Sequence, residues 1–175
     1  AGDLVLTTDD SVITGDALRF YAGMAHVTGH PVRIESGKDW VEARSATVNT
    51  MTKVATLHGV RQIFFMMKGG LEAMVGVNGL DKKPADPNAE TPVTLTCRGP
   101  VYVDQNLGSF FARDCVVVRS GDSRIDTDRL ELTFDPVTSK LAGARAAGRV
   151  FLRTPDTAAS GDRLVYDVAT ATVSL

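Results

Sequence analysis

The amino-acid sequence predicts an all-β fold in which β-hairpins stack into a jelly roll or an imperfect solenoid. Apolar and polar residues alternate along most of the chain, which is the period of strands with one buried face. No segment combines a sustained apolar helical period with caps at both ends. A hairpin-like outline also recurs, because Gly15–Phe20 and Gly161–Tyr166 both read Gly-Asp-x-Leu-x-aromatic and are both followed by Ala-x-Val.

Two looser copies of this outline lie between the close ones. Val41–Asn49 and Asp128–Pro136 each alternate and end in a polar turn, and a second apolar stretch follows from Val54 and from Leu141. Units of one supersecondary type that cannot bury their own apolar face are expected to stack on one another. Because the copies are irregularly spaced, the sequence does not predict a strict repeat.

The remaining elements follow from short patterns along the chain. Near the N-terminus, Leu4–Leu6 and Val12–Ile13 flank a polar turn. The unbroken apolar run Ile63–Met67 predicts a strand that is buried on both faces. A polar, proline-rich stretch at about 78–92, beginning with an Asn-Gly turn signal, predicts an exposed loop. With that loop included, residues 1–175 are expected to form a single domain.

The two cysteines fall in a predicted hairpin that turns about Asn106. In this register the numbers of facing residues sum to 212, so Cys97 lies opposite Cys115. The same register gives other favourable cross-strand pairs, namely Arg98 with Asp114, Val101 with Phe111 and Tyr102 with Phe110. A disulfide formed in an oxidising compartment and two separate buried thiols are both compatible with the pattern. A one-residue bulge would destroy the register.

Composition excludes several classes of function. The 175 residues carry a net charge of −2, which argues against an unassisted nucleic-acid surface. Aromatic residues make up only 6% of the chain, which is few for carbohydrate stacking. No apolar run approaches the ~20 residues that a transmembrane helix needs, and Ala1–Asp3 does not begin a signal peptide. We therefore expect a mature segment cut from a longer precursor, which can itself carry a membrane anchor.

The sequence offers no catalytic constellation. His26 and His30 have the helical metal spacing, but in a strand residues four apart lie about 13 Å from each other. No Gly-x-Ser-x-Gly elbow and no phosphate-cradling loop is present. Paired acids such as Asp9-Asp10 and Asp126-x-Asp128 are explained as solvated turn or strand residues. We predict no enzymatic activity, no catalytic residue, no metal site and no cofactor.

The motif Asp162–Asp167, continued by Ala171–Leu175, resembles the OstA-like family, the organic-solvent-tolerance or lipopolysaccharide-transport group of periplasmic proteins. Gly15–Val27 and Asp128–Phe134 are similar in style. The resemblance implies a twisted β-jelly roll, a V-shaped stack of antiparallel strands with an open apolar groove. It further implies a non-enzymatic periplasmic scaffold that carries lipopolysaccharide toward the outer membrane.

On this reading, acyl chains of lipid A lie in the groove, where each buried methylene contributes about 0.8 kcal/mol. The residues expected to line it are apolar residues of the repeats and of neighbouring strands: Leu18, Phe20, Leu57, Phe64, Leu132, Phe134, Leu164 and Tyr166. Arg19, Arg129 and Arg163 are placed to meet lipid phosphates at the rim. Unpaired strands at the ends of the stack would pair with other OstA-like domains, including copies of the same chain.

Two other functions are compatible with the pattern. One is a ligand-free structural β-solenoid of a cell-envelope protein, in which Ile63–Met67 and the methionines are ordinary core. The other is a carbohydrate-binding jelly roll, which would need a concave aromatic patch beside paired acids. Within the transport reading, the roles of soluble bridge, anchored partner and translocon domain all stay open.

Overall fold

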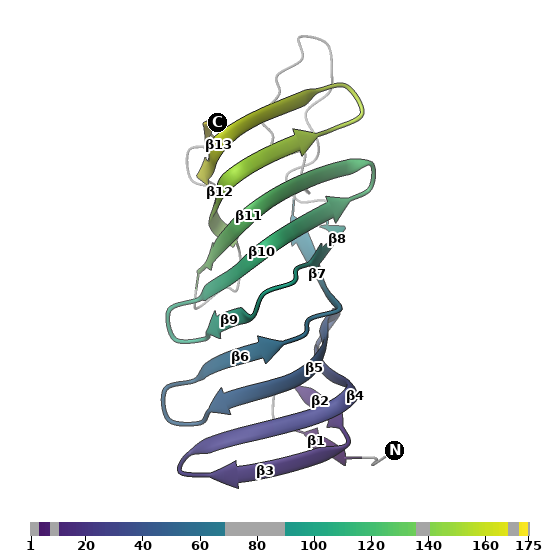
Figure 1. Ribbon diagram of the computed structural model, residues 1–175, viewed down its shortest axis with the longest axis vertical. Coiled ribbons are helices and arrows are strands. Elements are labelled where there is room, and N and C mark those ends of the chain that lie inside the picture. The colour runs from purple at the N-terminus through teal and green to yellow at the C-terminus, as the bar shows by residue number, and fades with distance from the viewer. Residues whose placement is uncertain (1–3, 8–10, 69–89, 136–140, 168–171, 175) are drawn as a thin grey trace.

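The computed structural model describes residues 4–7, 11–68, 90–135, 141–167 and 172–174. Every secondary-structure element in these ranges is a β-strand, and all of them belong to one 14-stranded sheet. The strands stack along the long axis of the molecule, with the N-terminal hairpins at one end and the C-terminal hairpins at the other (Figure 1). The predicted all-β jelly-roll class is therefore confirmed.

The path through the sheet is β1-β2-β4-β5-β6-β9-β10-β11-β12-β13-β14, and every pairing is antiparallel. Three strands lie off this path, because β3 pairs with β4, β7 with β5 and β8, and β8 with β10. The strands have the following bounds: β1 (Leu4–Thr7), β2 (Val12–Gly15), β3 (Ala17–Tyr21), β4 (Met24–Ser36), β5 (Asp39–Asn49), β6 (Val54–His58), β7 (Gln62–Lys68), β8 (Glu90–Thr96), β9 (Val101–Asp104), β10 (Ser109–Ser120), β11 (Ser123–Phe134), β12 (Leu141–Arg153), β13 (Ala158–Asp167) and β14 (Thr172–Ser174).

The sheet is folded into two layers, and its long strands belong to both. One half of β4 pairs with β3 and the other half with β2. In the same way β5 pairs with β6 and with β7, and β10 pairs with β9 and with β8. We call the layer that contains β3, β6 and β9 the front layer, and the layer that contains β1, β2, β7 and β8 the rear layer (Figure 1).

The long strands pass from one layer to the other at irregularities in their pairing. The register shifts between Thr28 and Val32 in β4, between Arg113 and Val116 in β10, and between Ala147 and Val150 in β12. A β-bulge bends its strand and increases the local twist. The aligned bulges therefore form the corner at which the sheet folds over.

The four recurring outlines are four hairpins of the front layer. They form β3–β4, β5–β6, β11–β12 and β13–β14, in agreement with the sequence prediction. The glycine that opens the first copy lies at the corner, and a Cβ there would be 2.8 Å from Val27 Cγ1 and 3.0 Å from the Thr28 carbonyl oxygen. The first copy thus carries a glycine where the backbone of the neighbouring strand approaches closely.

The hairpin that contains the cysteines forms, but its predicted register is wrong by one residue. In β9–β10, Tyr102 pairs with Phe111 and Val101 with Ala112, because the four-residue turn 105–108 is centred beyond Asn106. Beyond the end of this ladder, at the bulge in β10, Arg98 lies opposite Asp114 as predicted. The Arg98 amide donates to the Asp114 carbonyl at 2.8 Å. Asp114 and Cys115 adopt positive φ angles of 65° and 56° there. Both thiols are free, with Cys97 buried and Cys115 exposed.

The predicted burial of Ile63–Met67 is wrong for one face of the strand, and most of the predicted loop lies outside the described residues. The run Ile63–Met67 forms most of β7 but is buried on one face only: Ile63 and Met67 are in the core, whereas Phe64 stacks on Trp40 with the ring centroids 5.6 Å apart. Of the predicted loop, residues 90–92 begin β8, and residues 78–89 lie outside the described residues.

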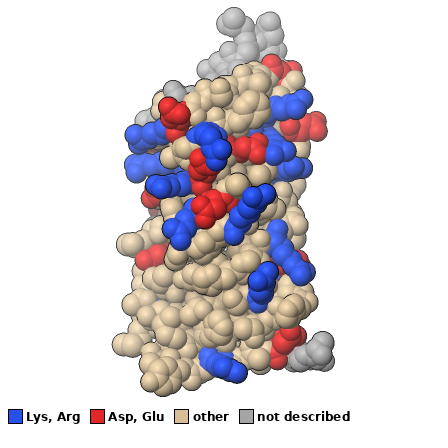
Figure 2. All heavy atoms as spheres, viewed as in Figure 1, with Lys and Arg blue, Asp and Glu red and all other residues tan. Residues whose placement is uncertain are grey.

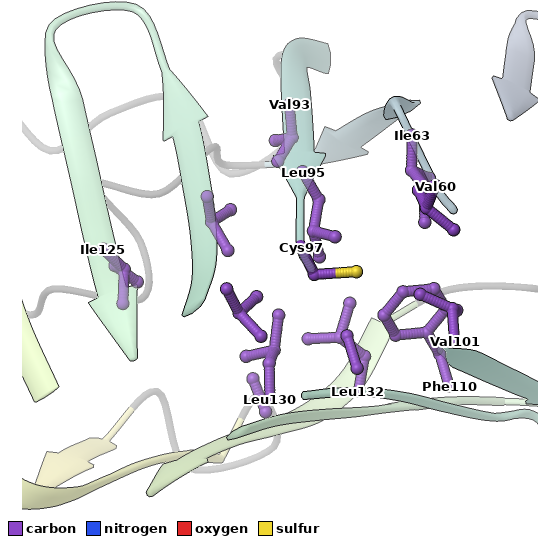
Figure 3. Close-up of a cluster of buried hydrophobic side chains, with 14 of the residues drawn as sticks. Val60, Ile63, Val93, Leu95, Cys97, Val101, Phe110, Ile125, Leu130 and Leu132 are labelled. Atoms are coloured by element: carbon purple, nitrogen blue, oxygen red, sulfur yellow. The ribbon is translucent and has the colours of Figure 1, made fainter. Parts of the chain in front are cut away.

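The core lies between the two layers. Val93, Leu95 and Ile125 reach it from the rear layer, and Val101 and Leu130 from the front layer (Figure 3). Each of these side chains is at most 2% exposed. Full burial of such a side chain contributes about 1.5–3 kcal/mol, so contact between the layers is the main force that keeps the sheet folded over.

Candidate functional site

The front layer carries two unbroken rows of apolar side chains along the long axis. Row A comprises Leu18, Val27, Ala46, Leu57, Val101, Ala112, Leu130, Ala146 and Leu164, each directly opposite the next across the ladder. Row B runs beside it through Phe20, Ala25, Val48, Ala55, Val103, Phe110, Leu132, Ala144 and Tyr166. At ~4.8 Å per strand, each row extends for about 38 Å.

The rear layer presents a matching row to the interior. Row C comprises Leu6, Ile13, Ile34, Val41, Ile63, Leu95, Val118, Ile125, Leu152 and Ala159, again as consecutive cross-strand partners. Rows A, B and C contain no charged residue. The only polar side-chain atom in the three rows is the Tyr166 hydroxyl. The three rows therefore form a continuous apolar surface along the stack, and the buried polar side chains of Ser120, Ser123 and Thr127 lie outside them.

The interior is open at its N-terminal end. Leu18 and Phe20 are 37% and 65% exposed, although both occupy interior positions of rows A and B. Their exposure follows from topology, because β3 pairs only with β4 and no further strand covers its other side. At the same end, the rear layer contributes Leu4, Leu6 and Ile13, which are only partly buried. We call these five residues the N-terminal opening.

Beyond this opening row A is buried between the layers, whereas Ala25, Val48, Ala55 and Val103 of row B are only partly buried. Every member of row A from Val27 to Leu164 is at most 2% exposed. Tyr166, at the far end of row B, is 8% exposed, and burial, followed by the charge of Asp167, raises the pKa of its hydroxyl. Any guest along row A would have to replace contacts between the layers.

Most of the eight residues predicted from the sequence lie on the interior face. Leu18, Leu57 and Leu164 belong to row A, and Phe20, Leu132 and Tyr166 belong to row B. Phe134 also packs against the core from the end of β11. Phe64 is on the outer face of the rear layer, opposite Trp40 in the ladder, so it does not line the interior.

Sequence reasoning missed most of the interior residues. No member of row C and none of the small residues of rows A and B was named as lining the groove, although Ile63 lay in the run predicted to be buried and alternation marks most of the others. The small members matter because each alanine of row A lies beside a valine or leucine, so that the surface of the row varies in depth.

The arginines named from the sequence lie on the outer face. Arg129 and Arg163 alternate with the interior residues Leu130 and Leu164, and both are exposed. Figure 2 shows basic and acidic side chains intermingled over the upper, C-terminal part of the front layer, whereas its lower part is largely uncharged. These arginines therefore do not border the interior rows directly.

The histidines do not form a metal site. His26 Nδ1 lies 2.8 Å from Thr47 Oγ1, whereas His30 Nδ1 lies 3.3 Å from an Asp16 carboxylate oxygen. Within the described ranges, no group of three or more His, Cys, Asp or Glu side chains is arranged to hold a metal ion. The same part of the chain contains no helix that is long and apolar enough to span a membrane.

Comparison with models of known protein families and with curated protein sequences finds no match. Among solved structures, the chain is similar to LptH from Pseudomonas aeruginosa, described as the LptA-homologous periplasmic component of the conserved lipopolysaccharide transport device. The TM-score is 0.54 at 11% sequence identity, and the match covers 82% of this chain and 94% of LptH. This chain has the LptH fold. The fold that the OstA-like motifs implied is thereby confirmed.

Proposed function

We propose that this protein is a non-enzymatic periplasmic scaffold that carries lipopolysaccharide toward the outer membrane. The observation that carries the proposal is the continuous apolar interior of rows A, B and C, open at the N-terminal end. The likeness to LptH supports it, because that protein is a component of a lipopolysaccharide transport device. The proposal holds whether or not a precursor anchors the chain to a membrane.

The physical basis is transfer of acyl chains from water to an apolar surface. Each methylene that leaves water contributes about 0.8 kcal/mol. Leu18 and Phe20 offer this surface without prior rearrangement, because they are already exposed. Deeper in, an acyl chain would contact Leu57, Leu132, Phe134, Leu164 and Tyr166 in exchange for the contacts that the two layers now make with each other.

The ends of the sheet supply the proposed contacts with other domains of this fold. Among the described strands, β1 pairs only with β2, β3 only with β4, and β14 only with β13. Unpaired edges are templates for pairing with another chain. We propose that one jelly roll adds to another through these edges, either as copies of this chain or as related domains. Sedimentation velocity at increasing protein concentration tests this, and a monomer at every concentration would contradict it.

The experiment on lipid binding compares two adjacent residues of β3. Phe20 occupies an interior position, whereas Tyr21 is on the other face of the strand and is 84% exposed. We measure displacement of a fluorescent lipid A analogue by lipopolysaccharide for the wild type and for the variants Phe20→Asp and Tyr21→Asp.

Loss of contact with about two methylenes corresponds to roughly tenfold weaker binding. We expect Phe20→Asp to lose at least this much and Tyr21→Asp to retain wild-type affinity. Both side chains are exposed, so neither variant should unfold, and near-ultraviolet circular dichroism checks this. Equal affinity of the two variants, or no binding by the wild type, would refute the proposal. A carboxylate at Leu164 is a poorer test, because that side chain is only 1% exposed and its replacement would disrupt folding.

A ligand-free structural domain is the second candidate, and the dense packing of row A favours it. In that case added lipopolysaccharide leaves the melting temperature unchanged. A scaffold that binds lipid only in its folded state is stabilised by it. Thermal unfolding with and without lipopolysaccharide therefore separates the two functions.

A further inference from the structure

Three arginines stand side by side on the outer face of the rear layer. Arg119 of β10 is directly opposite Arg124 of β11, and Arg124 is directly opposite Arg153 of β12. Their chain neighbours Val118, Ile125 and Leu152 are buried in the core, so the three arginine side chains lie on the opposite face. They are therefore separated from the apolar rows by the thickness of the sheet.

This arrangement is electrostatically unfavourable in the absence of a partner. Like charges directly opposite each other destabilise a β-ladder. Within the described ranges, Arg124 alone of the three has a carboxylate partner: its Nε and Nη2 donate to Asp126 at 2.7 and 2.6 Å. Arg119 and Arg153 form no ion pair with any residue that the structure describes. Asp126 thus fixes the orientation of the central guanidinium, and an uncompensated guanidinium remains on each side of it.

The three arginines border a concavity of about 430 Å³. The turns β10–β11 and β12–β13 close it, contributing Gly121, Thr154 and Pro155 to its wall. These two turns lie on the same side of the molecule in Figure 1. Gly121 adopts a φ of 53°, and a Cβ there would meet open space. One acidic residue, Asp122, also borders the concavity.

We propose that this concavity binds a phosphate group, either on a small molecule such as a sugar phosphate or on a lipid headgroup. The guanidinium fork donates two parallel hydrogen bonds to a phosphate, which makes arginine the preferred residue for such groups. A dianionic phosphate also offsets the repulsion within the row. The volume lies within the range of about 300–1,000 Å³ that is typical of small-molecule sites, so it accommodates more than a single phosphate. The site does not depend on the proposed lipid-binding interior.

The test uses glucose 6-phosphate with glucose as its uncharged counterpart. Binding is followed by amide chemical shifts for the wild type, for Arg119→Gln and Arg153→Gln, and for Arg163→Gln as a control on the outer face of the front layer. We expect glucose 6-phosphate to bind, glucose not to bind, and each of the first two variants to weaken binding about tenfold. Arg163→Gln should bind as the wild type does, and Asp122→Asn should bind more tightly.

A second arm identifies the source of the phosphate. Vesicles of phosphatidylcholine are compared with vesicles that also contain phosphatidic acid, and binding is measured by co-sedimentation at low and high salt. Binding only to the second kind, lost in Arg153→Gln, assigns the site to a lipid headgroup, whereas binding of glucose 6-phosphate alone assigns it to a soluble ligand. Wild-type affinity in Arg119→Gln and Arg153→Gln, or an equal loss in Arg163→Gln, would overturn the proposal. So would failure of the wild type to bind either probe.

Discussion

Truncation of the same residue type at the two ends of row A should have very different effects on stability. Leu164 is 1% exposed and Leu18 is 37% exposed. Leucine-to-alanine changes at buried sites cost about 2.7–5 kcal/mol, because the lost transfer free energy is accompanied by a cavity. For Leu164→Ala we therefore expect a loss of about 3–4 kcal/mol in the free energy of unfolding. Leu18→Ala leaves no enclosed cavity, because water can fill the space. We therefore expect a loss of roughly 1 kcal/mol in the free energy of unfolding.

Urea unfolding measures this difference, with circular dichroism following the sheet and fluorescence following Trp40, the single tryptophan. In a chain of this size, 1 kcal/mol shifts the melting temperature by about 2–4 °C, so thermal scans should show a drop of about 10 °C for Leu164→Ala and about 3 °C for Leu18→Ala. Equal losses, or a larger loss for Leu18→Ala, would show that the C-terminal interior is not packed and that the N-terminal end is not open.

Three further predictions concern the corner of the sheet and its neighbourhood. Burial, with a smaller contribution from a nearby aspartate, raises the pKa of Cys97 to about 11, so at neutral pH iodoacetamide should label the exposed Cys115 and spare Cys97, as peptide mass spectrometry can show. A hydrogen bond from Arg149 lowers the pKa of Asp128, so this contribution to stability is present above the unfolded-state pKa and is lost as the pH falls through the folded-state value. Arg149→Gln should raise that pKa in an NMR titration, and an unchanged value would refute the assignment. Gly15→Ala should lower stability by about 1–3 kcal/mol in urea unfolding, since its Cβ would contact a neighbouring strand, and a neutral outcome would mean that the corner can relax.

The repeated outline predicts interior residues because it specifies which side chains share one face of a strand. Leucine and the aromatic residue stand two positions apart, so in a strand they project to the same side, and Leu18 with Phe20 and Leu164 with Tyr166 occupy rows A and B. The hairpins and several large residues of rows A and B could therefore be predicted from local pattern alone. By contrast, Phe64 sits in an unbroken apolar run, where alternation gives no indication of which residues face inward.

The bulges explain what the sequence could not reveal. At the bulge in β10, Asp114 and Cys115 adopt positive φ angles without any glycine to mark the position. The register of the cysteines was hidden for this reason, whereas the bulges in β4 and β12 contain Gly29 and Gly148. One pair of the arginine row could have been predicted from the sequence. A two-residue turn at Gly121 and Asp122 places Arg119 directly opposite Arg124. Arg153 joins them only across a pairing that is itself interrupted by bulges.

The line of bulges also determines how the molecule can deform. Backbone hydrogen bonds connect strands within the front layer and within the rear layer, and the long strands join the layers at the corner. Rotation of one layer away from the other about this corner is a hinge motion that breaks no ladder hydrogen bond in either layer. Among the described residues, apolar contact across the interior opposes it, and a hydrocarbon guest would replace that contact with apolar contact of its own. A filled core and a capacity for guests are therefore compatible in this fold, provided that the corner acts as the hinge.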